Sequence, residues 1–132
     1  MLCTTNTSSP PTLTHPSTTQ AEDGDLIVLA TDGYSDNVFG ETTLIVTDKL
    51  LRARPPTVPI SIASLADLMV LTARERAQST TADTPFSKNA ASHGYNFEGG
   101  KIDDITLIVA HVHGPKSGRA GKVGVNYTLR RV

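Results

Sequence analysis

The sequence feature that most constrains this chain is a pair of short apolar runs, each bordered by aspartate. The first run, residues 26–30, is followed by Asp32 and Gly33. The second begins at Ile105, directly after Asp103 and Asp104. Short runs of branched apolar residues between turn residues are typical of buried strands. The sequence therefore predicts two strands, with a carboxylate after the first and before the second.

The direction in which these strands pair decides whether their acids meet. In an antiparallel pair, the end of the first strand lies beside the start of the second. Asp32 and Asp103 would then lie at one edge of one sheet. Parallel pairing would place them at opposite ends, so the functional interpretation depends on antiparallel pairing.

Three segments between the two runs have the signals of helices. Residues 38–53 place apolar side chains on one face. Residues 61–79 are the strongest case, because apolar residues recur there at three- and four-residue steps. A shorter helix is predicted between Thr84, which suits a cap, and Gly94, which suits the position past the end. The predicted class is α+β, with antiparallel strands and packed helices; two strands alone do not make a stable sheet, so the isolated chain is expected to fold poorly.

The two ends of the chain differ in composition from the middle. Residues 1–21 are rich in Thr, Ser and Pro, bury little apolar surface and are predicted to be a disordered lead-in. Residues 114–132 combine basic residues with glycines and lack acids, so a basic flexible tail is predicted, with weak contact to anionic surfaces as the alternative. Residues 22–113 remain as the folded part.

Charge and hydropathy exclude several kinds of partner. The net charge is −1, which gives no whole-chain argument for nucleic acid. No apolar run approaches the ~20 residues of a membrane helix. A single cysteine, Cys3, excludes a disulfide within the chain. No nucleic-acid or membrane partner is expected.

Paired acids at one edge of a sheet suit a hard divalent cation. Mg²⁺ and Mn²⁺ prefer oxygen ligands and often bind a few carboxylates and several waters. The alternative for Asp32 is that Asp-Gly is a common turn pair. Asp103 and Asp104 have a similar alternative, because acids that precede a strand usually face water. Both interpretations remain open on the pattern alone.

Other chemical signals are weaker. His111 and His113 could share one face of a strand, but no third nitrogen or sulfur ligand lies near them in the sequence. Residues 99–101, Gly-Gly-Lys, look superficially like a phosphate loop, but the first glycine and the following helix are missing. No serine or cysteine has the setting of a nucleophile, so no catalytic side chain is predicted.

The stretches GDLIVLATDGYSDN and GGKIDDITLIVAHV resemble two motifs of the PPM-type, or protein phosphatase 2C, metal-dependent serine/threonine phosphatases. Residues 84–106 resemble the subgroup whose founding members work in mitochondria. The resemblance covers residues 22–113. It implies an α-β-β-α sandwich, of which this chain would be a part, with a two-metal centre of Mg²⁺ or Mn²⁺ between the sheets.

The resemblance also implies roles for individual residues. Asp32 matches the metal-binding aspartate of the Asp-Gly pair, and Gly33 matches its partner. Asp103 matches the metal-binding aspartate that opens the last motif. Asp104 stands where most of the family has Asn, and is expected beside the metal ligands. Asp36 matches an acid that sometimes contributes to a further, weaker metal site; its alternative role is a helix cap.

As a whole, the resemblance implies a hydrolase that uses metal-activated water on phosphoserine or phosphothreonine of a phosphoprotein. It further implies an intracellular monomer, mitochondrial or cytoplasmic. The first half of the family pattern, which carries a phosphate-binding Arg and early acidic ligands, has no counterpart in residues 1–21. The chain is therefore expected to be an incomplete C-terminal portion and inactive alone. The alternative is a non-catalytic remnant or regulatory binding module of the same fold.

Overall fold

The structure is a computed structural model that describes residues 2–3, 20–53, 55, 57–59, 61–114 and 124–132. These residues form an α+β fold, as the sequence predicts. In chain order its elements are β1 (Leu2–Cys3), β2 (Leu26–Ala30), α1 (Asp32–Ser35), α2 (Gly40–Ala53), α3 (Ile62–Gln78), α4 (Pro85–Ser92), β3 (Thr106–His113) and β4 (Gly124–Arg131). Among the helices described here, none has the length and apolar character needed to cross a membrane.

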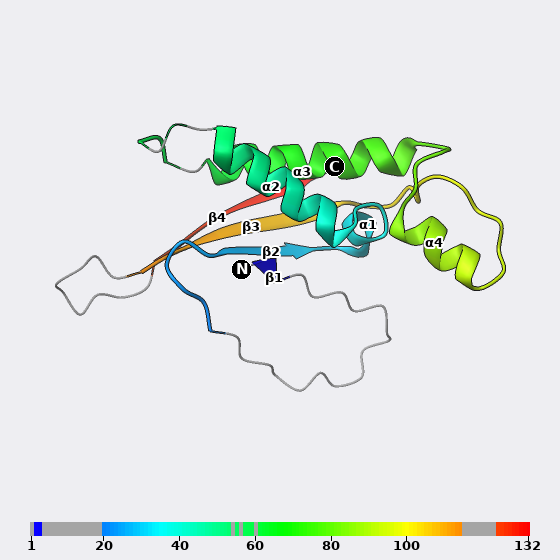
Figure 1. The fold of residues 1–132 in the computed structure, drawn as a ribbon, viewed down its shortest axis with the longest axis horizontal. Helices are drawn as coiled ribbons and strands as arrows, with labels where there is room; N and C mark the ends of the chain where they lie inside the picture. The colour runs from blue at the N-terminus through cyan, green and yellow to red at the C-terminus, as the bar shows by residue number, and fades with distance from the viewer. Residues whose placement is uncertain (1, 4–19, 54, 56, 60, 115–123) are drawn as a thin grey trace.

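The strands form one sheet in the order β1-β2-β3-β4 (Figure 1). β2 and β3 are antiparallel, with Leu26 opposite His111 and Ala30 opposite Leu107. β4 is antiparallel to β3, and the two-residue β1 is parallel to β2. The antiparallel pairing on which the functional interpretation depends is therefore confirmed.

β4 shows that the prediction of a flexible tail is wrong for residues 124–131. Every residue of β4 is paired with β3, from Gly124 opposite His113 to Arg131 opposite Thr106. The apolar residues Val125, Tyr127 and Leu129 alternate with polar ones, which is the two-residue period of a strand, and all three are exposed. β1 likewise falls within the predicted lead-in. Residues 4–19 and 115–123 lie outside the described residues.

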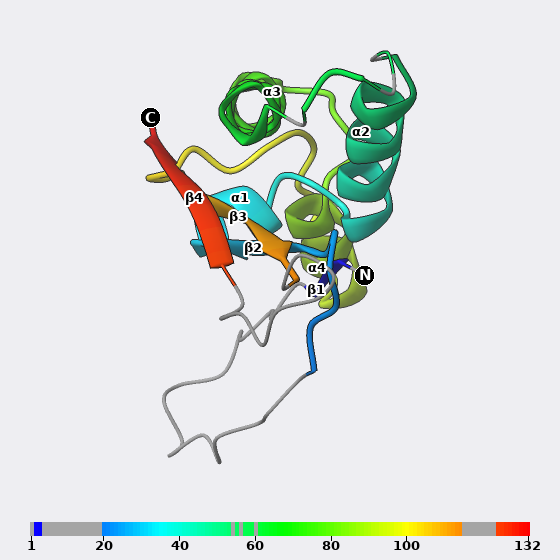
Figure 2. The same cartoon turned by 90° about the vertical axis from the view of Figure 1, so that its left-hand side faces the viewer.

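The core lies between α3 and one face of the sheet. Figure 2 shows α3 over the sheet and α2 beside α3. The apolar stripe predicted for α3 is confirmed, since its buried residues are Leu65, Ala66, Met69, Val70, Ala73 and Ala77. Leu107 and Val109 of β3 belong to the same cluster and are fully covered. Burial of this continuous apolar surface is the main stabilising contribution to the fold.

The helix predicted over residues 38–53 is confirmed as α2, which begins two residues later at Gly40 and ends at Ala53. The short helix α1, which comes before it, was not predicted. The buried residues of α2 are Thr43 and Thr47, each of which reaches a backbone carbonyl one turn earlier. Thr43 also shares a 2.8 Å hydrogen bond with the buried Tyr34 of α1. The hydroxyl groups of these residues can be buried because each has a hydrogen-bond partner.

The sheet face opposite α3 is apolar and exposed. Leu29 pairs with Ile108, which pairs with Leu129, so these side chains share one face. Leu29 is 51% exposed, Leu129 is 53% exposed and the neighbouring Tyr127 is 71% exposed. No helix in the described part of the chain covers this face, as Figure 1 shows.

Candidate metal-binding site

The turn from β2 into α1 places Asp32 at the edge of the sheet. β2 ends at Ala30, Thr31 is extended, and Asp32 is the first residue of α1. The Asp32 carboxylate is exposed, and its Oδ1 accepts a hydrogen bond of 3.0 Å from the Gly33 amide. An acidic side chain in the first turn of a helix is favoured by the free amides there.

Thr31 joins the end of β2 to the start of β3. Its Oγ1 donates to the carbonyl of Asp104 at 2.9 Å and accepts from the amide of Thr106 at 3.0 Å. Its own amide donates to the Thr106 carbonyl at 3.0 Å. Three hydrogen bonds from one residue therefore hold the segment that carries Asp103 and Asp104 beside the segment that carries Asp32.

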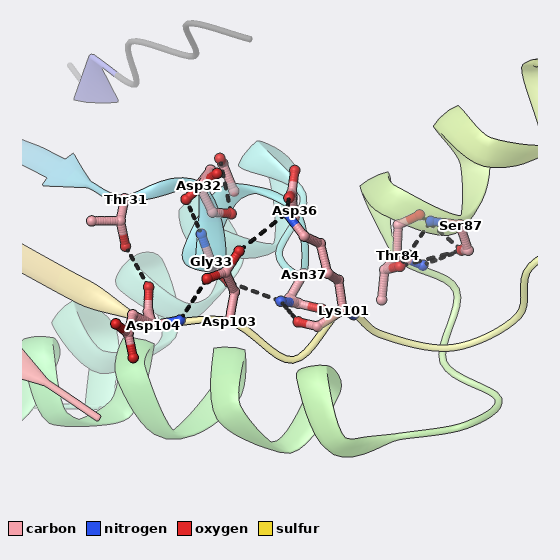
Figure 3. A network of polar contacts seen from close by, with 11 residues as sticks. Thr31, Asp32, Gly33, Asp36, Asn37, Thr84, Ser87, Lys101, Asp103 and Asp104 are labelled. Atoms are coloured by element: carbon pink, nitrogen blue, oxygen red, sulfur yellow. Dashed lines mark hydrogen bonds and ion pairs between the residues drawn. The ribbon is translucent and has the colours of Figure 1, made fainter.

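Gly33 lies directly against the second acidic segment. A Cβ atom at Gly33 would lie 2.5 Å from the carbonyl oxygen of Asp104 and 3.3 Å from Cβ of Asp103. Only a residue without a side chain fits this approach. Figure 3 shows Asp32, Gly33 and Asp103 grouped at the start of α1. The structure thus brings the two predicted acidic segments together, and the reason for a glycine after Asp32 is steric.

Asn37 is a buried residue of this site that the sequence did not single out. Its side chain is fully covered and donates to the carbonyls of Gly33 and Lys101, both at 2.8 Å. Its Oδ1 accepts from the Lys101 amide at 2.9 Å. Asn37 thereby fixes α1 against the segment before β3. The only sequence signal was its position within the GYSDN stretch, because a single polar residue has no periodicity.

Lys101 forms an ion pair with two acids of the site. Its Nζ lies 2.8 Å from Asp36 Oδ2 and 3.1 Å from Asp103 Oδ2. Hydrogen bonds to Asp36 and then Asp103 raise the pKa of Lys101 above its ordinary value. Lys101, and next the Asp104 amide, hold the pKa of Asp103 below its ordinary value. The Asp103 carboxylate is therefore charged at neutral pH, and the Lys101 ammonium lies between it and Asp36.

Asp36 and Asp104 lie at the borders of this group. Asp36 is the C-cap residue of α1. It does not cap the start of α2, which begins four residues later at Gly40, so the alternative role as a cap of that helix is wrong. The Asp104 side chain is 81% exposed, and its Oδ2 lies 3.5 Å from an Arg131 nitrogen of β4. Asp104 therefore points toward β4 while its backbone supports Thr31.

The carboxylates are the type of ligand that a divalent cation prefers, but too few of them lie together for a complete site. Carboxylate oxygens of Asp32 and Asp103 are ligands that Mg²⁺ and Mn²⁺ prefer. Across the described ranges, however, no three His, Cys, Asp or Glu side chains form a group that could hold a metal ion. One oxygen of Asp103 is also paired with Lys101. The structure therefore brings two candidate ligands into neighbouring segments, without a third within the described ranges.

The histidine pair lies at the other end of β3. The rings of His111 and His113 are 4.2 Å apart between centroids, and His113 Nε2 lies 3.1 Å from Nδ2 of Asn126. The predicted sharing of one face is thus consistent with the structure. The pair is not part of the acidic site, because Asp103 precedes the start of β3 and the histidines are near its end.

The glycines of the Gly-Gly-Lys stretch have a packing role. A Cβ at Gly100 would lie 2.0 Å from the carbonyl oxygen of Arg76, and one at Gly99 would lie 2.4 Å from that of Ser79. Gly99 also has a φ of +89°, which glycine adopts readily. These glycines let the chain pass close to the end of α3, and they do not form a phosphate loop.

The chain is similar in sequence to several proteins named protein phosphatase 2C. It is 38% identical over 96 residues to "Probable protein phosphatase 2C BIPP2C1" of Oryza sativa subsp. japonica, covering 72% of this chain and 16% of that protein. It is 37% identical over 95 residues to "Probable protein phosphatase 2C 55" of Arabidopsis thaliana, covering 70% and 19%. It is also 34% identical over 86 residues to "5-azacytidine resistance protein azr1" of Schizosaccharomyces pombe, covering 65% and 29%.

These similarities concern one segment of longer proteins. The chain spans less than a third of the length of each of these three relatives. No family model matches the sequence, and no solved structure matches it significantly. The similarity is therefore between this segment and part of proteins that are named protein phosphatase 2C.

Proposed function

We propose that this chain is part of a metal-dependent protein serine/threonine phosphatase, which hydrolyses phosphoserine or phosphothreonine in a phosphoprotein. The sequence similarity to proteins named protein phosphatase 2C supports the reaction class. The observation that carries the proposal is the contact of Gly33 with Asp103 and Asp104. This contact brings the two acidic segments of the resemblance to one edge of the sheet.

In this proposal, Asp32 and Asp103 are metal ligands, and Gly33 allows their segments to meet. Each carboxylate has one oxygen held by the amide of the next residue, at 3.0 Å for Asp32 and 2.8 Å for Asp103. These bonds restrict rotation of each carboxylate, and the second oxygen of Asp103 is the one paired with Lys101. A bound Mg²⁺ or Mn²⁺ would lower the pKa of a coordinated water and so supply the nucleophile.

A complete catalytic centre needs more ligands than these two. Because the chain spans 16% and 19% of the two plant relatives, we propose that the other ligands and the phosphate-binding group come from further polypeptide. Asp36 and Asp104 are placed at the border of the centre. A monomeric state and a mitochondrial or cytoplasmic location remain predictions from the resemblance.

The second candidate function is a non-catalytic binding or regulatory module of the same fold. Two observations favour it: Asp103 is already paired with Lys101, and no third metal-binding side chain joins the group within the described ranges. This candidate keeps the fold and the family relationship but has no hydrolytic step.

Hydrolysis of para-nitrophenyl phosphate in a Mn²⁺ titration separates the two candidates when it is measured on a polypeptide that contains this chain together with the segment that supplies the other ligands. The phosphatase proposal expects hydrolysis that falls by about 100-fold in Asp32→Asn and Asp103→Asn, because each removes a ligand charge. Asp48→Asn is the matched control, since Asp48 is an exposed acid of α2 paired with Arg52. Absence of hydrolysis at every Mn²⁺ concentration would favour the non-catalytic module.

A further inference from the structure

We propose that Lys101 is a built-in counter-cation of the acidic site, so that a divalent cation must compete with its ammonium group. This inference rests on the proposed metal-binding role of Asp103. One nitrogen, Lys101 Nζ, lies within 2.8 Å of Asp36 and 3.1 Å of Asp103. The two acids come from different segments, one after α1 and one before β3 (Figure 3). The ammonium therefore joins the segment after α1 to the segment before β3, and one of its two partners is the proposed ligand Asp103.

The position of Lys101 is fixed by its backbone. The buried Asn37 side chain binds both the amide and the carbonyl of Lys101, at 2.9 and 2.8 Å. The ammonium also lies 5.7 Å from the centroid of the Phe86 ring of α4. A backbone held in this way limits the positions that the side chain can reach. The bridge is thus a property of the fold, unlike an exposed pair between two free side chains.

The surroundings of the bridge are partly shielded from solvent. The side chains of Lys101, Asp36 and Asp103 are 34%, 31% and 36% exposed. Charges in such a setting interact more strongly than fully solvated ones. A divalent cation that binds Asp103 would meet repulsion from the ammonium. Replacing the ammonium by a neutral group would leave two carboxylates facing each other, which favours cation binding.

This arrangement also assigns a role to Asp36. The family resemblance implies an acid at this position that sometimes contributes to a further, weaker metal site. In this chain the Asp36 carboxylate is paired with Lys101. The ammonium takes the place of that further cation, and Asp36 is a positioning residue for Lys101. Removal of the lysine charge frees Asp36 to act as a ligand.

Mn²⁺ binding to the full 132-residue chain tests this inference, with free Mn²⁺ measured by electron paramagnetic resonance. Lys101→Met keeps most of the aliphatic stem and removes the charge, and is expected to bind Mn²⁺ about tenfold more tightly than the wild type. Lys101→Gln is a second neutral variant with the same expectation. Lys101→Arg keeps the charge and is expected to bind as weakly as the wild type. The gain should disappear in Lys101→Met combined with Asp36→Asn.

Lys88→Met is the matched control, because Lys88 is an exposed lysine paired with Asp83 on another part of the surface. Equal Mn²⁺ affinity of the wild type and the two neutral variants, including no binding by any of them, would overturn the inference. A gain in Lys101→Arg or Lys88→Met would do the same. A further variant tests the proposed function separately. If adding Asp32→Asn to Lys101→Met leaves the Mn²⁺ affinity unchanged, Asp32 is not a metal ligand and the proposed function fails.

Discussion

At the residue scale, the site depends on a position where no side chain fits. Gly33 follows Asp32 and touches the backbone of Asp104. The Asp-Gly pair was predicted as either a turn or a metal motif, and both alternatives need a glycine for local reasons. The structure gives a long-range reason, which no local pattern contains: the glycine contacts a segment about seventy residues away in the chain.

Replacement of Gly33 by alanine is expected to lower the free energy of unfolding by about 1–3 kcal/mol. The new Cβ would overlap the Asp104 carbonyl, so backbone must shift. Gly40→Ala is the control, because nothing lies within 4 Å of a Cβ there and alanine favours the first turn of α2. Urea unfolding of both variants checks this. Equal stability of the two variants would show that α1 does not approach Asp104 as described.

Tyr34 is expected to make the free energy of unfolding depend on pH in the alkaline range. Burial raises the pKa of Tyr34 above its ordinary value of 10.0. The folded state therefore holds the phenol proton more tightly than the unfolded state. Its contribution is fully present below the unfolded pKa and is lost as pH rises through the raised folded pKa.

Tyr34→Phe removes both this pH dependence and the hydrogen bond to Thr43. The variant is expected to lose about 1 kcal/mol of unfolding free energy at neutral pH. The difference from the wild type should narrow as pH rises above 10.0. Urea unfolding across this pH range measures it, and a difference that widens above pH 10.0 would contradict a buried neutral phenol.

At the scale of elements, local signals predicted α3 and α4 well. Ser61 is the N-cap of α3 and Thr84 is the N-cap of α4, and Pro85 occupies the first position of α4. β4 was missed because its alternating pattern is short and lies among basic residues and glycines. Its pairing with β3 is a tertiary property. The short helix α1 was missed for the same reason, since its Tyr34 meets Thr43 of α2 only in the fold.

The cap of α4 is expected to matter more than that of α3. Thr84 is buried, accepts from the Ser87 amide at 3.1 Å and donates to the Gly99 carbonyl at 2.9 Å. Ser61 is exposed and makes a cap bond of 3.2 Å with the Ser64 amide. Thr84→Ala should cost about 2 kcal/mol of unfolding free energy and Ser61→Ala about 0.5 kcal/mol. Thermal or urea unfolding tests this order, and the reverse order would contradict it.

At the scale of the whole molecule, the sheet has one covered face and one open apolar face. The sequence indicated that more strands were needed, and the structure adds β1 and β4 to the two that were predicted. The meeting of the two segments that carry Asp32 and Asp103 could be predicted, because it follows from antiparallel strand direction. The roles of Asn37 and Lys101 could not be predicted, because they depend on contacts between residues more than sixty positions apart in the chain.

The open face is expected to bind the dye ANS, because contiguous exposed apolar surface of this kind is uncommon on monomeric proteins. Leu129→Lys should reduce ANS fluorescence, since Leu129 lies in the row with Ile108 and Leu29. Leu71→Lys is the control: Leu71 is 57% exposed, similar to Leu129, but lies on α3. An equal reduction by both variants would show that the dye does not report on the sheet face.

The most direct measurement of whether the two acidic segments hold one cation is paramagnetic broadening by Mn²⁺ in amide NMR spectra of the full chain. The amides of Gly33 and Asp104, each bonded to the neighbouring carboxylate, should broaden at the lowest Mn²⁺ concentrations. Asp32→Asn and Asp103→Asn should each weaken the effect at both amides. Broadening that begins near His111 and His113, or that affects only one of the two acidic segments, would contradict a shared cation site.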